Sequence, residues 1–154
     1  MASVLKQIFI ITQINSPVMK LRQIPFALHQ LIDQLVYSLL PQTTQRKSLI
    51  VNDVQQGLLV NTDKNILTTV LSNLLDTTIM HTQNNCIRIS AKFFGNITLI
   101  HVKDNDNLHD RAIIDSMYQV ESMAEKLGGC ITISNNRVNG TTVAFSVFNN
   151  QQVA

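Results

Sequence analysis

Residues 63–82 constrain the fold more than any other stretch, because they keep an apolar stripe at the period of an α-helix. Thr62 stands where an N-cap is expected, and Asp63 places a carboxylate in the first turn, where the helix dipole favours it. The segment therefore predicts one amphipathic helix packed against a core. The stripe consists of aliphatic side chains at the spacing i, i+3, i+4, i+7 and i+8: Ile66, Leu67, Val70, Leu71, Leu74 and Leu75.

Two polar residues of this helix, Asn73 and Thr77, are four positions apart and so share a face beside the stripe. Such a pair can line a pocket. It can equally be a pair of solvated positions on the helix surface. The residues alone leave both interpretations open.

The composition is that of one globular domain. The chain has 154 residues, of which 45% are hydrophobic and 14% charged, enough for a core without metal or disulfide support. A net charge of +2 over scattered Lys and Arg does not predict nucleic-acid binding. Cys86 and Cys130 lack zinc-site spacing and are expected as free thiols, which favours a cytoplasmic location. Residues 2–15 are too short to cross a bilayer, so no membrane segment is expected.

The N-terminal part of the chain is predicted to be helical after an ambiguous start. Residues 3–14 fit either a helix or a strand, and an extended piece, residues 18–22, follows. Pro25 is expected to begin a helix and Pro41 to close it.

The rest of the chain, apart from the helix at residues 63–82, alternates strands with one more helix. An apolar stripe from Ala112 to Leu127 predicts that helix, which the following glycines end. Gly95 and Asn96 are expected to join one pair of strands as a hairpin, and residues 135–140 the last pair. Strand-like runs occupy residues 48–54, 58–61, 86–93, 97–103, 131–134 and 141–148.

This order predicts an α+β fold, a two-layer α/β sandwich with three helices on one face of a mixed sheet. No internal repeat, low-complexity tract or linker interrupts the chain. We expect residues 18–154 to form one domain, preceded by a helical extension of residues 1–17.

Seven short stretches, in their order and spacing, resemble the ATP-binding catalytic domain of sensor histidine kinases. They are IPFALHQLID, KSLIVNDV, LLVNTDKNILTTVLSNLLDTTIMHT, IRISAKF, VKDN, LGGCITISNN and NGTTVAFSV. The resemblance covers about Val4 to Phe148 and implies the Bergerat-type (HATPase, GHKL) fold shared with gyrase and mismatch-repair ATPases. Residues 4–22 look like the end of the dimerisation helix that precedes this domain in such kinases. The phosphoacceptor segment, a His-Glu pair with Arg-Thr-Pro, does not occur in the sequence.

The resemblance implies nucleotide-binding roles for Asn73, Thr77, Asp104 and Thr141. In the family, the central helix carries two asparagines four residues apart, and the second ligates the magnesium that bridges the phosphates. Asn73 matches the first and Thr77 replaces the second, so these two are the implied Mg²⁺ ligands. Asp104 matches the carboxylate that accepts the adenine amino hydrogens, and Thr141 matches the threonine that supports it.

The phosphate end of the site departs from the family. Met80 stands where a lysine often faces the phosphates, which removes a cation. Asp106 and Leu108 replace the glycines of the Asp-x-Gly-x-Gly loop, whose backbone approaches the nucleotide closely. The chain passes from Leu108 into the helix before Gly128 with no room for the ATP lid, whose amides cradle phosphate and exclude water.

Together these features predict a degenerate ATP-binding domain of a two-component system, a pseudokinase that binds a protein or, weakly, ATP or ADP with Mg²⁺. Expected partners are a response regulator or a partner kinase domain. Val4, Ile8 and Ile11, if helical, would also favour a homodimer. Two alternatives remain open: an active histidine kinase domain whose site a partner chain completes, and a structural or regulatory module with an empty pocket. Whether the chain is an enzyme stays undecided at this point.

The histidines are weaker candidates for chemistry. His29 lies beside an apolar helical stripe, His81 ends the central helix, and His101 is inside a strand. Each is expected to be a packing or surface residue.

Overall fold

A mixed five-stranded sheet, in the order β2-β4-β5-β7-β6, organises the computed structural model, which describes residues 24–105, 111–136 and 140–150. β2 runs parallel to β4, and the other neighbouring strands pair antiparallel. The pairing of β1 (Phe26–Ala27) with β3 (Leu59–Val60) forms a separate two-stranded sheet. The strands of the large sheet are β2 (Leu49–Asn52), β4 (Cys86–Phe94), β5 (Ile97–Asp104), β6 (Ile131–Asn136) and β7 (Gly140–Phe148).

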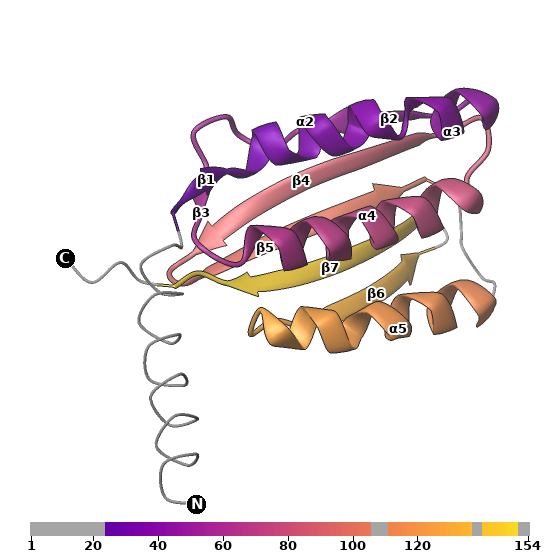
Figure 1. Ribbon diagram of the computed structural model, residues 1–154. Coiled ribbons are helices and arrows are strands. Elements are labelled where there is room, and N and C mark those ends of the chain that lie inside the picture. Colours follow the sequence, from indigo (N-terminus) through magenta and orange to yellow (C-terminus); the bar gives the residue numbers. More distant parts are fainter. Residues whose placement is uncertain (1–23, 106–110, 137–139, 151–154) are drawn as a thin grey trace, which may run out of the picture.

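Three long helices cover one face of this sheet. They are α2 (Leu28–Ser38), α4 (Lys64–Met80) and α5 (Arg111–Lys126), and α4 lies between the other two (Figure 1). The predicted α+β sandwich with helices on one face of a mixed sheet is therefore confirmed. A short helix that was not predicted, α3 (Leu40–Gln45), follows α2.

The core lies between the helices and the sheet, because alternate strand residues point to the helix side. Ile100 on β5 and Phe145 on β7 are fully buried there. From α4, the predicted stripe residues Leu67, Leu71 and Leu74 are buried to the same degree. Each such side chain stabilises the fold by about 1.5–3 kcal/mol relative to an exposed one, so α4 is held mainly by its apolar stripe.

The structure corrects three predicted helix boundaries. The N-cap of α4 is Asp63, not Thr62, since the Asp63 carboxylate accepts hydrogen bonds from the backbone N–H of Asn65 and Ile66. Pro25 does not begin the first helix. The next residues pair with β3 instead, and the Leu28 N–H donates to the Leu58 carbonyl, so helical hydrogen bonding starts later.

Pro41 does not close a helix either. α2 ends at Ser38, and Pro41 occupies the first turn of α3, where its missing N–H costs nothing. Leu39, which separates the two helices, has φ −96° and ψ 2° and its side chain is buried.

The N-terminal extension, residues 1–17, lies outside the described residues, so its helix, its dimerisation and the domain boundary at residue 18 remain predictions. Within the described part of the chain, no helix is both long enough and apolar enough to cross a membrane.

Candidate functional site

A buried carboxylate stands at the end of the sheet where α4 ends. Asp104 is the last residue of β5, and its register partners are Ile87 on β4 and Thr141 on β7. It follows Thr98, Ile100 and Val102 on the helix-facing side, so strand alternation turns it toward the helices. Asp104 is 1% exposed and Thr141 2%. The structure thus brings these two predicted site residues together.

Thr82, just beyond the end of α4, reaches this carboxylate from the helix layer. Its side chain is fully buried, and its hydroxyl donates to Asp104 Oδ2. The same hydroxyl oxygen lies 2.7 Å from the Thr78 carbonyl oxygen, so two acceptors compete for its one hydrogen. Since a buried carboxylate is costly unless it is hydrogen-bonded, Thr82 helps to hold Asp104 in place at the end of the sheet.

Gly140 allows β7 to begin against the backbone of Asp104. Its φ is +80°, in the left-handed region that favours glycine. A Cβ atom at this position would lie 2.1 Å from the Asp104 carbonyl oxygen and 2.7 Å from the carbonyl carbon of Asn105. No side chain fits there, so the close approach depends on glycine.

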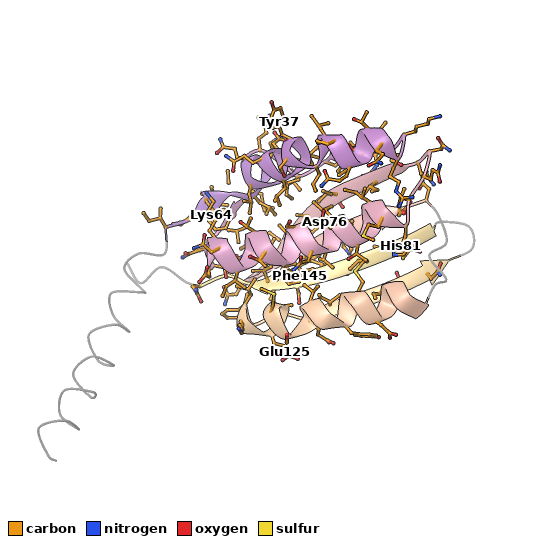
Figure 2. The ribbon with its side chains drawn as sticks, turned by 45° about the vertical axis from the view of Figure 1, so that its right-hand side comes forward. Tyr37, Lys64, Asp76, His81, Glu125 and Phe145 are labelled. Atoms are coloured by element: carbon orange, nitrogen blue, oxygen red, sulfur yellow. The ribbon has the colours of Figure 1, made fainter. Side chains whose placement is uncertain are left out.

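The other predicted site residues lie on the outward side of α4. Asn73 is exposed and Thr77, one turn later, is half-buried. Met80 continues this face and is 61% exposed. Asp76 lies on the C-terminal half of the same helix, and His81 follows its last residue (Figure 2). The nucleotide-binding and metal-binding roles of Asn73, Thr77, Asp104 and Thr141 remain predictions.

A magnesium nucleotide fits this set of groups poorly. This side of α4 offers an amide (Asn73), a hydroxyl (Thr77) and a thioether (Met80), none of which is positively charged. The neighbouring Asp76 adds a negative charge. Mg²⁺ prefers hard oxygen ligands, usually carboxylates together with phosphates, and phosphate itself calls for cations. The adenine amino group would moreover meet a carboxylate that already accepts from Thr82. Asp106 and Leu108 lie outside the described residues.

His29, His81 and His101 take the surface and packing positions expected from the sequence. His29 Nδ1 lies 2.6 Å from the Val54 carbonyl oxygen, and its Nε2 lies 3.1 Å from an Asp33 carboxylate oxygen. The first contact ties α2 to the segment after β2, and the second lies within α2. His81 is the C-cap of α4, and His101 points to the open side of the sheet, opposite the helices.

Two residues of this site, Thr82 and Gly140, carried no sequence signal for their contacts. Thr82 is separated from Asp104 by 22 positions, and no local periodicity reports such a contact. Gly140 was visible as a turn residue, but its approach to the Asp104 backbone depends on the pairing of β5 with β7.

Solved structures share this fold. The chain matches the Acinetobacter baumannii histidine kinase AdeS with a TM-score of 0.72 at 16% identity, over 97% of this chain and 83% of that one. Full-length ShkA in complex with AMPPNP matches with a TM-score of 0.72 at 15% identity, over 86% of this chain and 32% of that one. The histidine kinase ThkA in complex with the response regulator TrrA matches with a TM-score of 0.71 at 15% identity, over 96% and 49%.

Neither a protein-family model nor a curated protein matches the sequence. At identities of 15–16%, the structural matches establish the fold: the described chain has the architecture of a histidine kinase catalytic domain.

Proposed function

We propose that this chain is a degenerate histidine-kinase-type ATP-binding domain of a two-component signalling system, which works by binding and does not transfer phosphate. The observation that carries the proposal is a difference between the two ends of the proposed site. Asp104, which the family resemblance matches to the adenine carboxylate, is buried and lies directly opposite the buried Thr141. The outward side of α4, by contrast, presents Thr77 and Met80 where the family has an asparagine and often a lysine.

The two replacements act on the charged end of the ligand. A hydrogen bond to a charged group contributes about 1.5–3 kcal/mol. Loss of a good magnesium ligand and of a phosphate-binding cation together therefore weakens nucleotide binding by about 3 kcal/mol or more, which is at least a hundredfold. Such a site holds ATP or ADP weakly and does not orient the γ-phosphate for transfer.

The partner we propose is a response regulator or a partner kinase domain in the cytoplasm. Support comes from the ThkA structure, in which a kinase of the same fold is bound to the response regulator TrrA. The ShkA complex with AMPPNP supports the nucleotide class, because it shows this fold holding an ATP analogue. Homodimerisation through residues 1–17 is a further part of the proposal, and sedimentation at high concentration tests it.

Restoring the lost groups tests the proposal. The double variant Thr77→Asn, Met80→Lys should bind Mg·ADP at least about tenfold more tightly than the wild type, measured by calorimetric titration. Thr69→Asn, the same kind of change at another exposed position of α4, is the matched control and should leave binding unchanged. If the double variant binds no better than wild type, these two positions do not face a nucleotide and the proposed origin of the degeneracy is wrong.

A second measurement addresses phosphoryl transfer. The wild-type chain, mixed with ATP, Mg²⁺ and a histidine-containing dimerisation domain, should leave that domain unphosphorylated. Labelled phosphate appearing on the histidine, and lost in Asp104→Asn, would instead support the active-kinase alternative.

A further inference from the structure

The face of the five-stranded sheet opposite the helices has an unusual distribution of side chains. Successive strand residues alternate between the two faces, and the register places one set on this open side. Apart from Gly140 at the start of β7, none of the open-side residues whose burial is described is buried, and none in the described strands is a carboxylate. From the three central strands they are Cys86, Arg88, Ser90, Lys92, Phe94, Ile97, Leu99, His101, Lys103, Thr142, Ala144, Ser146 and Phe148.

Positive charge gathers on the β4–β5 half of this face. Arg88 on β4 lies directly opposite Lys103 on β5, and Lys92 lies two open-side positions along β4 from Arg88. Like charges directly opposite each other destabilise a sheet, so this arrangement is not one that stability alone selects. Asp53 forms both a hydrogen bond and an ion pair with Arg88. Its negative charge and this hydrogen bond raise the pKa of Arg88, which stays ionised. Among the described residues, no carboxylate forms an ion pair with Lys92 or Lys103.

An apolar row crosses one end of the same face. Ile97 on β5 is the direct register partner of both Phe94 on β4 and Phe148 on β7. These three side chains are 60% (Phe94), 44% (Ile97) and 44% (Phe148) exposed. Large aliphatic and aromatic groups left in water side by side are characteristic of a surface that is covered by a partner.

The negative charges of the helix layer lie on the other side of the molecule. Asp115, Glu121 and Glu125 belong to α5, and Glu125 points away from the sheet (Figure 2). A surface shaped only for solubility mixes both signs on each face. The open side of the described strands carries cations and no carboxylate, whereas α5 carries Arg111 and Lys126 together with its three carboxylates.

We propose that the open face of the sheet docks an acidic segment of a partner protein that carries apolar side chains at one end. Its carboxylates lie over Lys92, Lys103 and His101, and its apolar end covers the row formed by Phe94, Ile97 and Phe148. The distance along β5 from Ile97 to Lys103 is about 20 Å at 3.3 Å per residue. A helix of about 13 residues has this length. This face is separate from the proposed nucleotide site, on the opposite side of the sheet from α4.

A protein partner fits this face better than a nucleic acid does. Duplex binding proteins typically contact about 6–10 phosphates, and this face offers Arg88, Lys92 and Lys103, of which Arg88 is already paired with Asp53. Single-stranded nucleic acid requires aromatic rings interleaved with the cations. Phe94 and Phe148 instead flank an isoleucine at the far end of the face.

The test is an NMR titration of the ¹⁵N-labelled full chain with a synthetic helical peptide of about 13 residues, rich in Glu and ending in Leu-Leu-Phe. We expect amide shifts confined to β4, β5 and β7. The affinity for the peptide should fall at least about fivefold between low and physiological salt. The double variant Lys92→Glu, Lys103→Glu should weaken binding at least about tenfold. Its fold is safeguarded because Lys103→Glu replaces a like-charge pair with a complementary one opposite Arg88.

Two controls make the result specific. Lys126→Glu changes an exposed lysine of α5 and should leave peptide binding unchanged. A peptide with every Glu replaced by Gln should bind at least about tenfold more weakly. Absence of shifts at millimolar peptide, equal binding of the Gln peptide, or shifts on the helix layer overturns the proposal. Tighter binding of oligouridylate than of the acidic peptide overturns the choice of a protein partner.

Discussion

Replacing Thr82 with valine removes one hydroxyl from the buried end of the sheet and keeps the shape of the side chain. Thr82 is fully buried, so no water replaces the lost donor without a rearrangement. The change leaves the Asp104 carboxylate without this hydrogen bond, and the Thr78 carbonyl loses its second contact. A hydrogen bond to a charged group contributes about 1.5–3 kcal/mol. We therefore expect Thr82→Val to lower the free energy of unfolding by about 2 kcal/mol.

Urea unfolding followed by circular dichroism measures this loss, and a thermal scan should show a fall in Tm of about 4–8 °C for a domain of this size. Thr69→Val is the matched control, because the Thr69 hydroxyl also bonds the carbonyl four residues earlier on α4 but is exposed. It should change stability by less than about 0.5 kcal/mol.

A double-mutant cycle assigns the effect to the Asp104 contact. If Thr82 acts through the carboxylate, its substitution should cost at least about 1 kcal/mol less in an Asp104→Asn background. The reasoning is refuted if Thr82→Val matches Thr69→Val, or if its cost is the same in both backgrounds. Either outcome would mean that Thr82 is ordinary core packing.

The remaining predictions concern local geometry. Gly140→Ala should destabilise the domain by about 3 kcal/mol, because its Cβ would collide with the Asp104 carbonyl at a positive φ. Gly57→Ala, where a Cβ meets nothing within 4 Å, should stay within about 1 kcal/mol of wild type in the same urea assay. Asp63→Ala should cost about 1 kcal/mol through loss of the α4 cap, and Asp63→Asn should retain most of that stability. An Asn variant as unstable as the Ala variant would argue against the cap.

The elements of the fold were predictable from the sequence because local patterns determine them. The helix of α4 depends on its own apolar stripe, and the turn at Gly95, whose φ is +58°, depends on a few neighbouring residues. The errors arose where a distant segment decided the local structure. Pro25 is a good first residue for a helix, but the residues after it pair with β3 instead. Thr62 has the chemistry of a cap, yet it is 5% exposed and Asp63 makes the cap contacts.

The site was predictable to a smaller extent. Asp104 and Thr141 were identified through a family resemblance, and the structure places them directly opposite each other. The contact from Thr82 and the close approach of Gly140 depend on the packing of α4 on the sheet and on strand register. Neither contact produces a periodic pattern in the sequence. The gathering of positive charge on the open sheet face likewise emerges only once the register fixes which side each lysine occupies.

The central claim is that this domain keeps the carboxylate of an adenine site but has lost the groups that hold the phosphates. The most direct test is a calorimetric titration of the wild-type chain with Mg·ATP and Mg·ADP, repeated on Asp104→Asn. The account predicts binding no tighter than about 0.1 mM, roughly −5.5 kcal/mol. Micromolar binding, about −8 kcal/mol, that disappears in Asp104→Asn would contradict it and indicate a working nucleotide site.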